Sequence, residues 1–299
     1  MTCPFLKETQ VKYCQTAAFR KMIPLAGSGR ADEKCSSAGY PSCALYQAQP
    51  TRETGAACPF LRESLMQYCG AAPVPKFVPY SESLLSRCGN DSHRYCELYL
   101  GMAHPRASAF GRDEIALPDW LHYSGNHMWL DVTEDGVCHA GIDGFLSRAL
   151  GRVERINYVW TRGLHRPAAV IAAAGLELEL VFPNPFLLTN CNLYLRADPS
   201  RLTSEPYTGG WLFEGVPAAE TMDNLVSGAA ARAWMEREQR RINEYLQQMP
   251  QVGTGGSTGP LAADGGLFAA GLAQQLDRDQ VRALFLEFFS PYASGKREP

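Results

Sequence analysis

The sequence predicts an α+β protein, in which a β-strand region with C-terminal helices follows two small four-cysteine metal-binding modules. Eight of the ten cysteines lie within the first hundred residues. Short segments that alternate apolar and polar residues follow them, and the last third is rich in helix-favouring residues. The length of 299 residues and the hydrophobic content of 45% suffice for about two domains.

The charge and the apolar patterning exclude several classes of protein. Lys+Arg 28 against Asp+Glu 31 gives a net charge of −3, which argues against a nucleic-acid partner. No apolar run approaches the roughly 18 residues that a membrane span needs. The first residues show no basic leader followed by an apolar segment. We therefore expect a cytoplasmic protein with no membrane span.

Residues 1–50 and 51–103 are two copies of one unit. At an offset of 55, the C-P-F-L that begins at Cys3 matches the C-P-F-L that begins at Cys58. Each copy reads C-P-F-L-x-E-x4-Y-C, then K-x2-P, then C-x7-C-x-L-Y. About fifty residues cannot easily bury a sufficient core, so a covalent or metal staple is expected.

We expect each copy to open with a short helix, over residues 3–14 and 58–69, and to place its C-x7-C pair on a second helical turn. Cysteines eight apart lie about 12 Å apart along a helix, too far for one ion unless the segment bends. The candidate ligands are Cys3, Cys14, Cys35 and Cys43 in the first copy, and Cys58, Cys69, Cys88 and Cys96 in the second.

Three interpretations of these cysteines stay open. Disulfides are disfavoured in a cytosolic chain. Zinc modules usually bring ligands in close C-x2-4-C pairs, which neither copy has. Iron–sulphur clusters accept thiolates from scattered positions, and a Cys-Pro step often lies beside such ligands. We favour two iron–sulphur clusters, one per copy, over zinc, and redox sensing by the thiols themselves remains open.

A linker is expected over residues 104–118, and strands after it. Residues 128–132 and 137–142 flank Glu134-Asp135-Gly136, which predicts a hairpin. Residues 153–159 and 168–174 predict two more strands. Residues 176–180 alternate Leu and Glu, so the leucines should face a core, and Gly175 should occupy the tight turn before them.

Residues 121–215 resemble the H-protein of the glycine cleavage system. The resemblance lies in G-N-H-M-W at 125–129, GVCHAGIDGFLSRAL at 136–150, Phe182-Pro183, Asn190 and Asn192, and the closing strand signature EPYTGGWLF at 205–213. It implies a flattened sandwich of two antiparallel sheets over residues 119–215. A generic biotinyl/lipoyl-type hairpin is the alternative fold.

The family's cofactor does not follow from this resemblance. H-proteins attach lipoate to a lysine at a hairpin tip, and counting back from Pro183 places that position at Gly175. The chain has no lysine between Lys76 and Lys296, and arginine cannot form the amide. Alanines at 172–174 also replace the acidic neighbour. We expect no lipoate and no carrier role.

Other polar residues of this region have structural interpretations. Cys138 and Cys191 are expected to pack as small apolar groups, and His127 and His139 to be hydrogen-bonded rather than ligands. Asp143 should cap the helix that follows it. Because no nucleophile–base pair, phosphate loop or two-histidine zinc motif is present, we expect no enzyme.

The C-terminal third is predicted to be helical. An amphipathic helix is expected over 216–249, a Gly-rich linker over 250–266 and a helical tail over 267–299. The tail helix should open with a capping box at Asp277 and Gln280. Its apolar face is Val281, Leu284, Phe285 and Phe288. We expect that face to dock on the chain's own body rather than on another chain.

These features predict a non-catalytic metalloprotein subunit. It would carry two iron–sulphur clusters, and its non-lipoylated H-protein-like domain would serve docking or electron relay with protein partners in a larger complex. The alternative is a cysteine-based redox sensor or a zinc-stapled adaptor.

Overall fold

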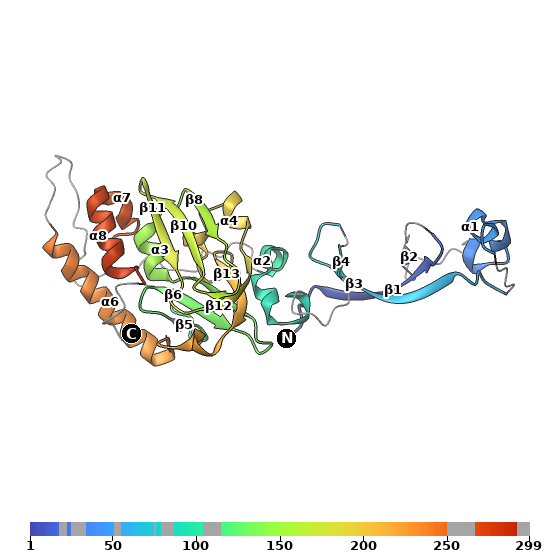
Figure 1. The fold of residues 1–299 in the computed structure, drawn as a ribbon, viewed down its shortest axis with the longest axis horizontal. Coiled ribbons are helices and arrows are strands. Elements are labelled where there is room, and N and C mark those ends of the chain that lie inside the picture. Colours follow the sequence, from blue (N-terminus) through green and yellow to red (C-terminus); the bar gives the residue numbers. More distant parts are fainter. Residues whose placement is uncertain are drawn as a thin grey trace. The chain divides into compact units, whose positions relative to one another are not determined.

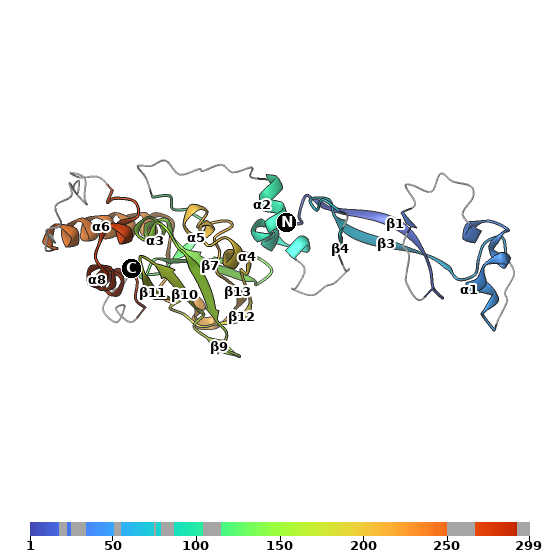
Figure 2. The same ribbon diagram turned by 90° about the horizontal axis from the view of Figure 1, so that it is seen from above.

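The computed structural model of the chain describes residues 1–17, 23–24, 34–50, 55–74, 76–78, 87–103, 115–249 and 267–291. It divides into two compact units, Met1–Met102 and Ala103–Pro299, which Figures 1 and 2 show from two sides. Of the predicted linkers, residues 104–114 and 250–266 lie outside the described residues.

The first unit is built on a long antiparallel pair of strands, β1 (Leu6–Cys14) and β3 (Leu61–Cys69). Short strands flank them, β2 (Ile23–Pro24) beside β1 and β4 (Lys76–Val78) beside β3. The helices expected over 3–14 and 58–69 are therefore wrong. Each segment finds its partner strand in the other copy, over nine paired residues, so the pairing between copies decides its conformation.

The C-x7-C segments are turns and short helices, as expected. Each crosses 3-10 turns before a short α-helix begins directly after the second cysteine, Cys43 or Cys96. The elements are 3-10 turns Lys34–Ser36, Tyr40–Ser42, Arg87–Gly89 and Asp91–Tyr95, with α1 (Ala44–Gln47) and α2 (Glu97–Ala103). In Figure 1, α1 lies near one end of the β1–β3 ribbon and α2 near the other.

The second unit is a sandwich of two antiparallel sheets. Among its described residues, one sheet has the order β14-β5-β6-β7-β13-β12-β9 and the other β11-β10-β8. The strands are β5 (His122–Tyr123), β6 (Met128–Val132), β7 (Cys138–Ile142), β8 (Arg155–Val159), β9 (Leu164–His165), β10 (Ala168–Ala173), β11 (Leu176–Val181), β12 (Phe186–Cys191), β13 (Phe213–Pro217) and β14 (Val226–Ser227). The predicted hairpin and the strands around residues 153–180 are confirmed, and the leucines of β11 are buried while its glutamates are exposed.

The core holds Trp129 under the connection that precedes β13. Its indole Nε1–H donates to the carbonyl of Pro206 at 3.0 Å, and a Cβ at Gly141 would lie 2.7 Å from its ring. The resemblance implied a closing strand over 205–213, and of these residues only Phe213 lies in a strand. The residues before it form turns that follow α5 (Arg201–Ser204) and carry the chain across the indole, so β13 begins only at Phe213.

The C-terminal helices pack beside α3 (Gly144–Leu150), and a short α4 (Tyr194–Ala197) follows β12. The long α6 (Gly228–Gln248) begins later than residue 216, because β13, a 3-10 turn (Ala219–Met222) and β14 take the intervening residues. Figure 2 shows α6 and α8 (Arg278–Phe288) on the α3 side of the sandwich. A short α7 (Leu272–Gln275) precedes α8.

The tail docks on its own chain, as expected. Phe288 packs on Phe145 of α3 and under the Arg241 guanidinium of α6, 4.0 Å from its ring centroid. The Asp277–Gln280 capping box is present. Within the described part of the chain, none of the helices is long and apolar enough to cross a membrane.

Candidate functional sites

The first candidate site is the hairpin tip between β10 and β11. Ala173 pairs with Leu176, so Ala174 and Gly175 form the two-residue loop, with φ of 51° and 70°. Two successive positive φ values are typical of a type I′ turn. Gly175 is exposed, and a Cβ there would meet open space. Gly175 therefore has open space where a side chain could stand, and it has no side chain.

The residues at this tip do not fit a lipoyl group. Attachment needs a side-chain amine, and the two loop residues are alanine and glycine. Two residues after the tip, Glu177 Oε1 forms an exposed ion pair with Arg155 Nη2 at 2.6 Å. Such a pair contributes little to stability and offers no nucleophile.

The second candidate site is the end of the β1–β3 ribbon where Cys3 lies. The Cys3 backbone N–H donates to the carbonyl of Cys88 at 2.9 Å, and Leu6, three residues on, pairs with Cys69. Burial, together with the neighbouring thiols of Cys3, Cys96 and Cys69, raises the pKa of the Cys88 thiol to about 11. Four cysteines from both copies thus share this end.

The opposite end repeats the arrangement. The Cys58 N–H donates to the carbonyl of Cys35 at 2.9 Å. Cys58 is buried with Tyr40 and Tyr46, and Cys35 and Cys43 pack against this group. Cys14 reaches the same end because it pairs with Leu61, three residues after Cys58.

The structure therefore does not bring together the four cysteines of either copy, as the expectation of one site per copy required. All ten cysteines of the chain are free thiols. Within the described ranges, no three His, Cys, Asp or Glu side chains converge closely enough to hold a single metal ion. The interpretation as a preformed zinc site gains no support from this spacing.

A buried charge cluster that the sequence did not reveal joins the sandwich to α6. His127 Nδ1 lies 2.8 Å from Asp143 Oδ2, and its Nε2 lies 3.6 Å from Glu238 Oε2. Arg241 completes the cluster, 3.0 Å from the same Glu238 oxygen. Burial alone would lower the pKa of His127, but Asp143 and Glu238 outweigh it and hold the pKa above its usual value. The sequence held one signal of this cluster, which is Glu238 within the apolar stripe of the helix expected over residues 216–249.

This charge cluster is structural. The His127 ring stacks on Phe145 with centroids 4.1 Å apart and is fully buried, so no substrate reaches it. Asp143 also caps α3 by accepting from the Leu146 N–H at 2.9 Å, as expected. Asp143, His127 and Glu238 thus hold one another in place.

The remaining predicted residues have the structural roles expected of them. Cys138 and Cys191 are buried, and burial raises the pKa of each thiol to about 12. His139 Nε2 lies 2.8 Å from Glu214 Oε2. Neutral buried thiols and a paired histidine are poor nucleophiles and poor ligands.

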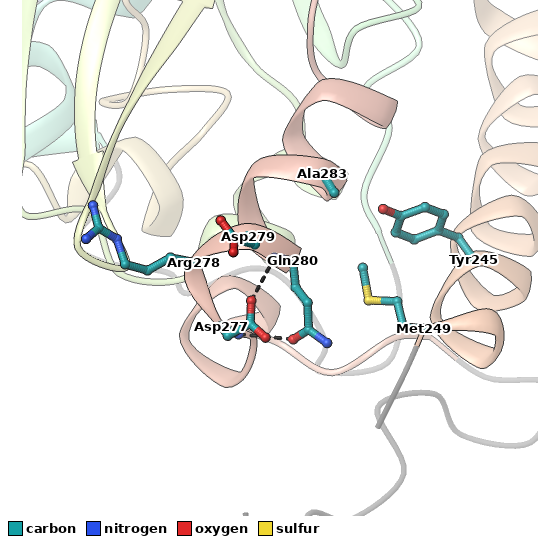
Figure 3. Close-up of a pocket in the computed structure, with 7 residues that line it drawn as sticks. All are labelled: Tyr245, Met249, Asp277, Arg278, Asp279, Gln280 and Ala283. Carbon is teal, nitrogen blue, oxygen red and sulfur yellow. Dashed lines mark hydrogen bonds between the residues drawn. The ribbon is translucent and has the colours of Figure 1, made fainter. Parts of the chain in front are cut away.

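An open cleft of about 560 Å³ lies between the end of α6 and the start of α8 (Figure 3). Tyr245 and Met249 form one side of it, and the cap of α8 forms the other. The cap groups are engaged with each other, since Gln280 N–H donates to Asp277 Oδ1 at 2.9 Å. Asp277 and Gln280 therefore serve the helix cap at this cleft.

Comparison with known proteins finds relatives over part of the chain. No family model matches the chain. Over 113 residues it is 32% identical to the glycine cleavage system H protein of Streptomyces avermitilis, which covers 36% of this chain and 89% of that protein. It is 27% identical over 115 residues to the H protein of Hydrogenovibrio crunogenus, covering 37% and 89%. The crystal structure of an H protein from Mycobacterium marinum matches with a TM-score of 0.36 at 20% identity, covering 41% of this chain and 98% of that one.

Proposed function

Because the chain belongs to the glycine cleavage system H-protein family through its sandwich domain, we propose that it is a non-lipoylated, non-catalytic member of that family. In this proposal the sandwich docks on protein partners of a larger assembly. The N-terminal unit carries two iron–sulphur clusters that relay single electrons between those partners.

The hairpin tip is the observation that carries the proposal. Gly175 stands where the resemblance places the carrier lysine, and Ala174 is the other residue of the two-residue loop. Without an amine the domain cannot carry a lipoyl arm, so the function that remains for the fold is recognition of partners. A fold alone does not establish an activity, so the non-catalytic part of the proposal rests on the missing attachment residue.

An exposed apolar edge of the same sandwich supports docking. Leu164 on β9 pairs with Leu187 on β12, and 55% and 45% of their surfaces are exposed. Trp160, in the connection that leads to β9, is 58% exposed. Neighbouring exposed apolar side chains are typical of protein interaction surfaces.

The cysteines support the electron-relay part. Eight thiols gather at the two ends of one ribbon without forming disulfides. A small unit of this kind gains folding free energy from bound metal. Four thiolates are the usual ligand set of [2Fe–2S] and [4Fe–4S] clusters.

Lipoylation in vitro tests the docking part. Wild-type protein, Gly175→Lys and a genuine H protein are incubated with a lipoate ligase, and intact mass is measured. We expect no addition to wild type and only slow addition to Gly175→Lys, because alanines at 172–174 offer no acidic neighbour. Gly163→Lys is the matched control, since Gly163 also has a positive φ and open space around it.

One result would contradict the proposal. If Gly175→Lys were lipoylated as readily as the genuine H protein, while Gly163→Lys were not, the hairpin would retain the carrier's recognition geometry. The absent lysine would then be a single substitution in a carrier, and the docking role would lose its main support.

A further inference from the structure

The two copies of the N-terminal repeat are related by an internal two-fold arrangement. In the register of β1 and β3, Gln10 faces Leu65, and these are equivalent positions of the two copies. Equivalent residues meet at a two-fold axis, and every other contact then occurs twice with the copies exchanged.

The contacts at the two ends obey this exchange. The bond from Cys3 N–H to the Cys88 carbonyl corresponds to the bond from Cys58 N–H to the Cys35 carbonyl, both at 2.9 Å. Gly70 N–H donates to Phe5 at 2.8 Å as Gln15 N–H donates to Phe60 at 2.9 Å.

Aromatic contacts fix the helix after each C-x7-C segment in the same way. Phe5 of the first copy packs on Tyr99 of the second, with ring centroids 5.9 Å apart. Phe60 of the second packs on Tyr46 of the first, at 6.1 Å. The C-x7-C segment of each copy is therefore held beside the Cys-Pro-Phe turn of the other.

The strands themselves keep the cysteines of one copy apart. Nine residues of extended chain span about 27 Å. The Cys-Pro-Phe turn and Cys14 of the first copy thus lie at opposite ends of β1, too far apart for one site held by four thiolates.

From these contacts we infer that each metal site takes one thiolate from one copy and three from the other. One site is Cys3 with Cys69, Cys88 and Cys96; the other is Cys58 with Cys14, Cys35 and Cys43. The ligand class is the iron–sulphur cluster of the proposed function, because each end brings four thiols together, which is the ligand set of such clusters. This inference rests on the proposed function, since it assigns the ligands of the clusters proposed there.

Two double variants of the full-length chain distinguish exchanged sites from one site per copy. Cys3→Ser/Cys69→Ser removes two thiols of different copies from one end of the ribbon. Cys3→Ser/Cys14→Ser removes two thiols of the same copy from opposite ends. All proteins are purified without oxygen, and iron, zinc and acid-labile sulphide are measured per chain.

Exchanged sites predict that Cys3→Ser/Cys69→Ser keeps half of the wild-type iron, while Cys3→Ser/Cys14→Ser falls well below half because both sites lose a ligand. The reverse pattern overturns the inference and leaves the proposed clusters in place. Wild-type protein that binds no metal overturns both. Zinc lost in the exchanged pattern supports these ligand sets and contradicts the iron–sulphur identity.

A measurement on wild-type protein covers the case in which a variant does not fold. Metal-free chain is treated with a short thiol-to-thiol cross-linker, and the linked peptides are mapped by mass. Exchanged sites predict links from Cys3 to Cys69, Cys88 or Cys96. Links from Cys3 to Cys14, Cys35 or Cys43 would overturn the inference.

Discussion

Single residues decide what this sandwich can and cannot do. The hairpin tip has Gly175 where the proposed function requires that no amine stands, whereas His127 adds a buried charge at the junction of the sandwich, α3 and α6. His127 has a φ of 63°, a conformation in which histidine and asparagine are more frequent than other side chains. Its replacement by asparagine can therefore keep the turn while removing the charge.

The His127→Asn variant should lose about 3 kcal/mol of unfolding free energy at pH 6, as expected when one partner of a buried charge cluster is removed. Because the folded-state pKa of His127 is raised above 6.5, its contribution is fully present below that value and is lost as pH rises through the folded pKa. The difference from wild type should therefore shrink at high pH.

Denaturant unfolding followed by tryptophan fluorescence measures this, because all five tryptophans lie in the second unit. His165→Asn is the matched control, because that ring forms an exposed hydrogen bond with the Gly163 carbonyl, at 2.8 Å from Nδ1. If the unfolding free energies of His127→Asn and wild type differed by the same amount from pH 6 to pH 9, the positive charge of His127 would contribute nothing to stability.

At the scale of elements, local patterns predicted the sandwich and failed for the repeat. The hairpin of β6 and β7 and the alternation of β11 are properties of adjacent residues, and both are confirmed. Residues 6–14 carry a pattern compatible with either state. What makes them a strand is a partner strand 55 residues away, which no local periodicity shows.

The same dependence on residues distant in the sequence limited how much of the candidate sites could be predicted. The eight cysteines and the missing lysine are visible in the sequence. Their grouping is not, because it follows from the antiparallel register of β1 and β3. The cluster of His127 and Glu238 likewise depends on how α6 lies against the sandwich, which is a tertiary contact.

Two substitutions within α8 test whether this helix docks on its own chain. Phe288 is buried against Phe145 and Tyr245. Phe288→Ala should cost about 3–5 kcal/mol of unfolding free energy in the fluorescence assay. Leu286 on the same helix is 58% exposed, so Leu286→Ala should change stability by less than about 0.5 kcal/mol. Equal effects of the two variants would contradict docking within the chain.

At the scale of the whole molecule, the chain joins a duplicated cysteine unit to an H-protein-like sandwich that lacks its attachment residue. The central claim is that this combination replaces a swinging carrier arm by bound clusters and a docking surface. The claim makes two predictions about the mass of the protein. A lipoyl group should be absent, and two clusters should be present.

Native mass spectrometry of protein purified without oxygen from its native host tests both together. The account predicts the mass of the 32.9 kDa chain plus two iron–sulphur clusters, which fall to the bare chain mass on acid denaturation. A lipoyl increment that survives denaturation and maps to residues 119–215, or a native mass without clusters, would contradict it.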